Sequence, residues 1–315
     1  MRHFILLLFF CISLVGAALA QTTDDPYTGL RIAELRAREY GAGSLVITDT
    51  FERNADFTRY IVNYPSDGYD VYGFMNVPAG EGPFPVVIVV HGYVPPRSYQ
   101  TLSYTTRYAD DLARAGFVVL QPNLRGHFPS AAITDDGLFS RVGYAVDVLN
   151  LMGLIQQQGG QPGPLQAADP QHVGLWGHSM GGGIVLRVLT VSNDVDAAVV
   201  YGSMSADERL NYERIRDFWT NGQEGNAELA TASGTLRQIS PIHYLADITA
   251  PMQIHHGDAD ADVPVAWSID LCERLTALQQ APGCYLYEGQ GHILRGDTDR
   301  YFQDQVRAFF AEHLR

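Results

Sequence analysis

Ser179 is the first residue whose type and surroundings predict chemistry. It stands at the centre of Gly-His-Ser-Met-Gly over residues 177–181. A serine in this G-x-S-x-G pattern is typical of a nucleophile held on a sharp turn between a strand and a helix. The apolar run 172–176 precedes the turn and the helix-compatible run 184–189 follows it. We therefore predict that Ser179 attacks a carbonyl carbon, and that His178 packs on the other side of the turn.

A general base must remove the proton of Ser179, because a serine hydroxyl is a poor nucleophile near neutral pH. After a nucleophile of this kind, the chain order is an acid and then a histidine. His292, which ends the loop Glu-Gly-Gln-Gly-His, is the predicted base. The acid is expected in the loop after the apolar run 252–255. Spacing alone does not choose among the carboxylates of that loop, which are Asp258, Asp260 and Asp262.

The same three aspartates could also begin a calcium-binding loop. A calcium-binding loop would have glycine where Val263 stands and glutamate where Ile269 stands, so the sequence does not fit one. His255 and His256 would point to opposite faces of a strand and would not converge on zinc. We expect no metal and no cofactor, because a site made of serine, histidine and aspartate needs neither.

Acyl transfer also requires N–H groups that hold the developing oxyanion. One is expected from the backbone of Met180, directly after the nucleophile. The other is expected from the loop after the apolar run 86–90, where we predict the backbone N–H of Tyr93, with Gly92 as the alternative. His91 is expected to brace this loop by hydrogen bonds without taking part in the chemistry.

A sheet must position these residues, and its strands are visible as short apolar runs. The runs cover residues 86–90, 117–120, 172–176, 197–200, 252–255 and 285–287. Strands that are apolar on both faces are typical of a parallel sheet covered by helices. Apolar residues at helical spacing, in 104–115, in 140–156 and near the C-terminus, supply those helices. The fold class is therefore α/β, with a mostly parallel, doubly wound sheet.

Two further stretches complete the organisation of the chain. Residues 45–64 and 69–78 are expected to form antiparallel strands joined by a turn at 66–68. Residues 203–240 are longer and more polar than the other connections, and they are expected to form a small cap insertion over the site. Apart from its first residues, the chain is expected to be one domain, 21–315.

Composition restricts the partners. A formal net charge of -14 over 315 residues argues against nucleic acid, whose phosphates need clustered lysine and arginine. The expected partner is a small-molecule ester or a short peptide. The sequence does not indicate the oligomeric state.

The first 20 residues predict export. A basic residue, a long apolar run and the small-x-small signal Ala18-Leu19-Ala20 are typical of a signal peptide cleaved after Ala20. The mature protein is then expected to be secreted or periplasmic, without stable membrane insertion. Cys272 and Cys284 remain after cleavage, and a pair of cysteines in an exported chain predicts one disulfide.

Taken together, these motifs resemble the α/β-hydrolase fold and, within it, the catalytic domain of the prolyl oligopeptidase family. The resemblance is carried by Gly-His-Ser-Met-Gly-Gly at 177–182, His-Gly-x-x-Asp-x-x-Val-Pro at 256–264 and Gly-Gln-Gly-His at 289–292. Asn-Leu-Arg-Gly-His at 123–127 and Ser-Pro-Ile-His at 240–243 are similar to further blocks of that family. Matched residue by residue, the resemblance places the acid at Asp260.

The resemblance leaves the substrate open. Full members of the peptidase family carry a β-propeller before the catalytic domain, and residues 21–90 are too few for several four-stranded blades. The stretch 91–99 resembles a subgroup of exported bacterial hydrolases, and the elbow is also similar to that of cutinases and polyester hydrolases. We expect a serine hydrolase that cleaves ester or peptide/amide bonds through an acyl-enzyme on Ser179, with a carboxylesterase acting on small or polymeric esters as the alternative. An acyltransferase and a non-catalytic binding protein are the remoter alternatives.

Overall fold

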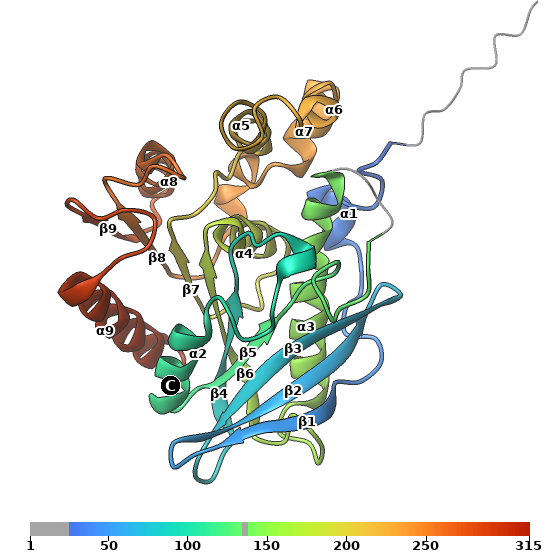
Figure 1. The fold of residues 1–315 in the computed structure, drawn as a ribbon, viewed down its shortest axis with the longest axis vertical. Helices are drawn as coiled ribbons and strands as arrows, with labels where there is room; N and C mark the ends of the chain where they lie inside the picture. The colour runs from blue at the N-terminus through green and yellow to red at the C-terminus, as the bar shows by residue number, and fades with distance from the viewer. Residues whose placement is uncertain (1–24, 134–137) are drawn as a thin grey trace, which may run out of the picture.

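The computed structural model describes residues 25–133 and 138–315, so the predicted signal peptide lies outside the described residues. In the described chain, nine strands form one sheet in the order β1-β2-β3-β5-β4-β6-β7-β8-β9 (Figure 1). The strands are β1 (Val46–Arg53), β2 (Phe57–Ser66), β3 (Tyr69–Pro78), β4 (Phe84–Val90), β5 (Val118–Pro122), β6 (Ala168–His178), β7 (Ala197–Tyr201), β8 (Met252–Gly257) and β9 (Gly283–Tyr287).

The six strands from β5 to β9 in this order run parallel, and β1, β2 and β3 add an antiparallel extension next to β5. This arrangement confirms the predicted α/β class and its mostly parallel sheet. All six predicted apolar runs lie within or overlap strands of the parallel part. Their buried positions on both sheet faces agree with an α/β protein whose sheet is covered on both sides.

The prediction of one strand over 45–64 is wrong, because the chain turns back within it. Asn54 makes that turn: its side-chain oxygen accepts from the backbone N–H groups of Asp56 and Phe57, at 2.9 and 3.0 Å. An asparagine that bonds the backbone two residues ahead replaces a turn residue of the glycine or proline type. The segment therefore forms β1 and β2, which pair with each other.

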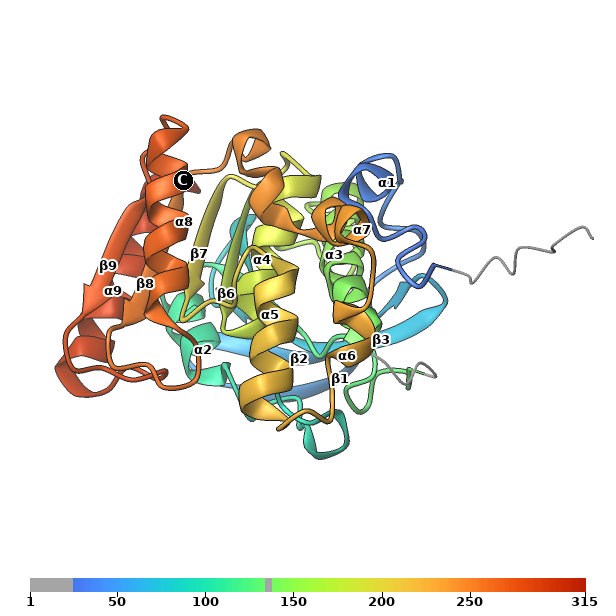
Figure 2. The same ribbon diagram turned by 90° about the horizontal axis from the view of Figure 1, so that it is seen from above.

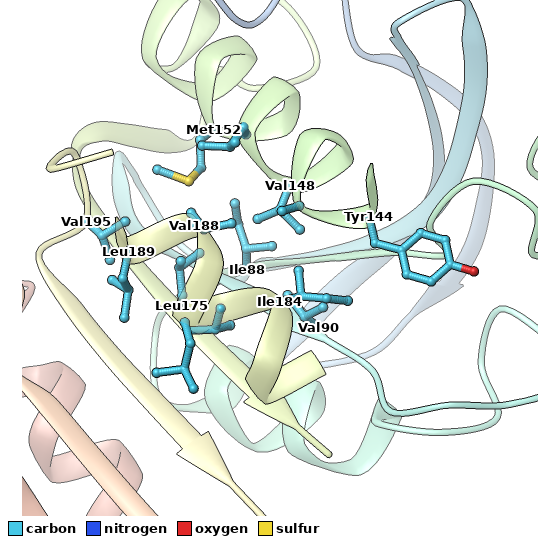
Figure 3. Packing of buried hydrophobic residues seen from close by; sticks show 14 of the residues in the cluster. Ile88, Val90, Tyr144, Val148, Met152, Leu175, Ile184, Val188, Leu189 and Val195 are labelled. Carbon is cyan, nitrogen blue, oxygen red and sulfur yellow. The ribbon is translucent and has the colours of Figure 1, made fainter. Parts of the chain in front are cut away.

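Helices cover both faces of the sheet, as the predicted double winding requires. The helices named below are α2 (Thr106–Arg114), α3 (Tyr144–Gln158), α4 (Met180–Val191), α8 (Val265–Ala277) and α9 (Gly296–His313). Side chains of α3, α4 and α8 pack on one face, and side chains of α2 and α9 pack on the other. Figure 3 shows Val148 and Met152 of α3 and Val188 of α4 gathered around Ile88 and Leu175 of the sheet.

Between β7 and β8, residues 203–240 form a helical segment outside the sheet layers (Figures 1 and 2). It contains α5 (Glu208–Arg214), a π-helical turn (Ile215–Trp219), α6 (Asn226–Leu229) and α7 (Ser233–Ile239). In the described part of the chain, none of the helices has the length and apolar character needed to cross a bilayer.

The start of the described chain, residues 25–36, packs against the helices of this segment and is called the strap below. Its helix α1 (Ile32–Arg36) lies beside α4 and α7 (Figure 2). The Arg36 guanidinium donates to the Thr190 carbonyl at 2.8 Å and pairs with Asp247 at 2.7 Å. The hydroxyl of Tyr27 donates to that of Tyr212 in α5 at 3.0 Å. These contacts fix the strap to residues that lie more than 150 positions further along the chain.

Candidate active site

Ser179 lies between the end of β6 and the start of α4, in a backbone conformation that is rare for a residue with a side chain. Its φ is 56° and its ψ is −119°, which matches the strained turn predicted for a nucleophile. Neighbouring glycines make the turn sterically feasible. A Cβ on Gly177 would lie 2.4 Å from the Gly181 carbonyl oxygen, and one on Gly181 would lie 2.1 Å from that of Val90.

His292 follows β9, and its Nδ1–H donates to Oδ2 of Asp260, which follows β8, at 2.7 Å. The Asp260 side chain is fully buried. Burial alone would raise the pKa of this carboxyl group, but hydrogen bonds from His256, His292 and the Val263 N–H outweigh burial and hold it well below the ordinary value. Asp260 is therefore an ionised partner that orients the His292 ring with Nε2 free for proton transfer.

The other two aspartates of the loop have different contacts. Oδ1 of Asp258 accepts from the backbone N–H of Gly289 at 2.7 Å, which ties the loop after β8 to the loop before His292. Asp262 is exposed and lines the cavity in front of Ser179. Of the three carboxylates that the sequence left open, Asp260 is the one hydrogen-bonded to His292.

A second histidine contacts the same carboxylate, and the sequence motifs did not predict this contact. Nε2 of the fully buried His256 lies 3.1 Å from Oδ2 of Asp260 and 3.1 Å from the Val263 carbonyl oxygen. On the other side of its ring, Nδ1 lies 2.7 Å from Oγ of Ser268 in α8. The sequence signal was the position of His256 at a strand end, four residues before the acid.

His178 bridges two parts of the site instead of only packing behind the turn. Its Nε2–H donates to the His292 carbonyl at 3.0 Å, so its Nδ1 accepts from the Tyr104 hydroxyl at 2.8 Å. Burial, with a smaller effect from the nearby His292, lowers the pKa of His178 to about 3. A ring that stays neutral is suited to fixing the His292 backbone and, as predicted, is unsuited to acting as the base.

The predicted oxyanion donors flank Ser179. Met180 is the first residue of α4, so its N–H has no acceptor within that helix. On the other side, a Cβ on Gly92 would lie 3.1 Å from Cβ of Ser179, which brings the loop carrying Tyr93 against the nucleophile. The buried ring of His91 braces that loop through contacts with the carbonyl oxygens of Gly92 and Asn123, at 2.7 and 3.0 Å.

A cavity of about 400 Å³ opens in front of Ser179 and His292. This volume lies in the range of small-molecule sites, roughly 300–1,000 Å³. Residues from the 203–240 segment form part of its wall. The apolar and aromatic lining consists of Tyr93, Tyr104, Met204, Ile215 and Trp219. The charged lining consists of Arg141, Glu224 and Asp262.

Ligand atoms of Asp260, Asp262 and His292 lie within 4.8 Å of one another, a grouping able to hold a metal ion. Two of these residues already have other partners. Oδ1 of Asp260 accepts from the N–H groups of Asp262 and Val263, at 2.8 and 2.9 Å, and its Oδ2 accepts from His292. The hydrogen bonds favour proton transfer over metal binding as the use of these groups.

Two family models match overlapping parts of the chain, which together cover residues 81–315. The model of the prolyl oligopeptidase family matches residues 164–315, which include Ser179, Asp260 and His292. A model of the serine aminopeptidase family matches residues 81–223.

Solved structures share the fold at low sequence identity. An acylaminoacyl peptidase of Pyrococcus horikoshii matches with a TM-score of 0.66 and 20% identity, over 84% of this chain and 43% of its own. A puromycin-hydrolysing peptidase of Mycobacterium tuberculosis matches at 0.65 and 21%, over 83% and 40%. The chain thus spans less than half the length of these two peptidases. Acetyl xylan esterase 1 of a Thermoanaerobacterium species matches at 0.64 and 18%, over 93% of both chains.

Proposed function

Because the chain is an α/β-hydrolase similar to the catalytic domain of the prolyl oligopeptidase family, we propose that it is a serine hydrolase. Ser179 is its nucleophile, His292 its general base and Asp260 the acid that orients the base. The observation that carries the proposal is the 2.7 Å hydrogen bond from His292 to the buried Asp260. His292 lines the same cavity as Ser179, whose backbone conformation is strained.

The reaction follows from these positions. His292 Nε2 takes the hydroxyl proton of Ser179 as the serine oxygen attacks the substrate carbonyl carbon. The backbone N–H groups of Tyr93 and Met180 hold the resulting oxyanion, and each donor of this kind lowers the barrier by about 3–4 kcal/mol. His292 then gives the proton to the leaving alcohol or amine. A water molecule, deprotonated by His292, releases the acyl group from Ser179.

Among the described residues, Ser179 and His292 line one cavity without a direct hydrogen bond between them. Contacts of this kind are commonly longer before substrate binds and tighten in the complex.

Ester and peptide substrates are both compatible with this machinery. The acetyl xylan esterase covers nearly the whole of this chain, whereas the two peptidases continue well beyond the part that matches. That difference in coverage favours an ester as the first substrate to assay. Esters are also the less demanding substrates, because an alcohol leaves more readily than an amine.

The test compares p-nitrophenyl acyl esters with aminoacyl and prolyl p-nitroanilides, using the wild type and Ser179→Ala. We expect ester hydrolysis by the wild type and a loss of about 10⁶-fold in kcat in the variant, the scale seen when a serine nucleophile is removed. Anilide turnover at comparable rates assigns a peptidase instead of a carboxylesterase. Equal activity of variant and wild type would disprove the assignment of Ser179.

We propose further that the protein is exported and cleaved after Ala20. The disulfide between Cys272 and Cys284, which joins α8 to β9, supports this proposal because disulfides persist in oxidising compartments. Mass spectrometry of the protein purified from its native cells is expected to give an N-terminus at Gln21 and no free thiol. A retained leader contradicts the proposal.

A further inference from the structure

The cavity in front of Ser179 contains one arginine among its lining residues, and the proposed chemistry does not use it. Arg141 comes from the short 3-10 turn (Leu138–Gly143) that leads into α3. Its side chain is 19% exposed. A largely buried guanidinium keeps its charge, so it must be compensated by a partner or by what enters the cavity.

The Arg141 guanidinium lies over the ring of Tyr93. Its central carbon lies 4.9 Å from the centre of the Tyr93 ring, within the range of a cation–π contact. A cation–π contact needs no hydrogen-bond acceptor, so it leaves the N–H donors of the guanidinium available to other partners. Those donors form the fork that matches a carboxylate with two parallel hydrogen bonds.

The acidic partner of Arg141 among the described residues is a weak one. The nearest guanidinium nitrogen lies 3.7 Å from a carboxylate oxygen of Glu224, beyond hydrogen-bond distance, and the Glu224 side chain is 49% exposed. An ion pair at this distance, with one partner half exposed to solvent, holds the guanidinium only weakly. A substrate group that formed two short hydrogen bonds with Arg141 would therefore displace Glu224 at little cost.

We propose that Arg141 is a specificity-determining residue that binds a carboxylate on the acyl part of the substrate. The inference rests on the proposed function, because the acyl group must be attached at Ser179 for its far end to reach Arg141. Tyr93 links the two places: its backbone is the proposed oxyanion donor and its ring supports Arg141. The substrate class is a half-ester or half-amide of a dicarboxylic acid, with an acyl chain short enough for a cavity of about 400 Å³.

Two carboxylates of the cavity lining, Glu224 and Asp262, repel an anionic substrate. Removal of Glu224 provides a second test. Glu224 competes with the substrate for Arg141, so its removal strengthens the preference for a carboxylate. Asp262 belongs to the loop that carries Asp260, at the His292 side of the cavity, and repels an anion placed there. The preference for a charged over a neutral substrate therefore depends on where its carboxylate lies in the cavity. Only a carboxylate beside Arg141 is favoured.

The experiment uses two p-nitrophenyl esters that differ only in charge, the hydrogen adipate and the adipamate, in which a neutral carboxamide replaces the carboxylate. The measured quantity is the ratio of kcat/KM for adipate to kcat/KM for adipamate, at low salt. We expect a ratio of at least ten in the wild type and a ratio near or below one in Arg141→Gln. In Glu224→Gln we expect the ratio to rise severalfold.

The outcomes separate this inference from the proposed function. Hydrolysis of both esters by the wild type with a ratio near one overturns the role of Arg141 and leaves the hydrolase intact. Activity that survives Ser179→Ala overturns the assignment of Ser179 as the nucleophile, and with it the proposed function on which this inference rests. A ratio that stays high in Arg141→Gln overturns the assignment of the carboxylate to that residue. If Arg141→Gln does not fold, Glu224→Gln decides, since an unchanged or lower ratio in that exposed variant contradicts the proposal.

Discussion

At the scale of single residues, His292 is held from two directions. Asp260 fixes its ring through Nδ1, and His178 fixes its backbone by donating to its carbonyl. Asp260 is itself held by His256, whose ring is anchored on Ser268 of α8. The proposed base, His292, thus depends on buried side chains from β6, β8 and α8 as well as on its own glycine-rich loop. Such support keeps a catalytic side chain within the narrow range of productive geometries.

The three aspartates of the acid loop give a matched mutational series. Asp260→Asn is expected to lower kcat for a p-nitrophenyl ester by about 10⁴-fold, because an amide cannot hold the His292 ring in the required tautomer. Asp258→Asn and Asp262→Asn are the controls, and each is expected to stay within about tenfold of the wild type, since neither carboxylate is bonded to His292. A loss at Asp258 or Asp262 as large as that at Asp260 contradicts this choice of acid.

At the scale of elements, the turn between β6 and α4 depends on close approach of backbones. Gly181 lies against the end of β4, which leaves no room for even a methyl group. At Gly183, two residues further along α4, an added Cβ would lie 3.4 Å from Cβ of Met204, an ordinary van der Waals distance. The two glycines differ in their surroundings and share a helix, so they form a natural comparison.

Gly181→Ala is expected to destabilise the protein by about 3 kcal/mol or more, or to prevent folding, because the new methyl group meets the Val90 carbonyl oxygen at 2.1 Å. Gly183→Ala is expected to be neutral or to stabilise by about 0.5–1 kcal/mol, since alanine is the better helix former. Guanidinium unfolding of both variants measures the difference. Equal midpoints for the two variants would show that the backbone at Gly181 relaxes freely.

The sequence predicts the elements of the core better than those outside it. Buried parallel strands are apolar on both faces, so each of the six runs was visible in the sequence. By contrast, β1 is largely exposed and its side chains follow no alternation, so the turn at Asn54 was missed. The helices of the 203–240 segment were missed because short polar helices owe their stability to packing against neighbours rather than to their own pattern.

The candidate site follows the same division. Ser179, Asp260 and His292 stand in local motifs that short-range patterns describe. His178 and His256 act through contacts with residues 74 to 114 and 4 to 12 positions away. Arg141 reaches the site through the ring of Tyr93 and belongs to no motif. The fold decides which polar side chains converge on a site. The spacing of residues along one chain therefore does not predict these contacts.

At the scale of the whole molecule, burial of histidines makes the protein sensitive to acid. Burial is the largest cause that lowers the pKa of His127, His178 and His255 to about 3 each. In the unfolded chain a histidine has a pKa of about 6.5. Between these two values the unfolded state binds more protons than the folded state, so the free energy of unfolding falls as the pH drops below about 6.5.

Unfolding measured by guanidinium at pH 7, 6 and 5 is expected to show a midpoint that falls steeply below pH 6.5. Each buried histidine removes about 1.4 kcal/mol per pH unit in that range. The depressed pKa of Asp260 acts in a lower window, because its stabilisation is complete above the ordinary aspartate value of about 3.9 and is lost only below it. His255→Gln is expected to flatten the dependence. A midpoint that is constant from pH 7 to pH 5 contradicts these burial effects.

The strap of residues 25–36 has a consequence for the order in which the molecule is completed. The ribosome adds these residues well before their partners Thr190, Tyr212 and Asp247, which are added only after most of the sheet has been synthesised. The strap can therefore complete its contacts with α4 and α7 only late in assembly. The strap thus secures α4, the helix that follows Ser179, only once the chain has been synthesised as far as Asp247.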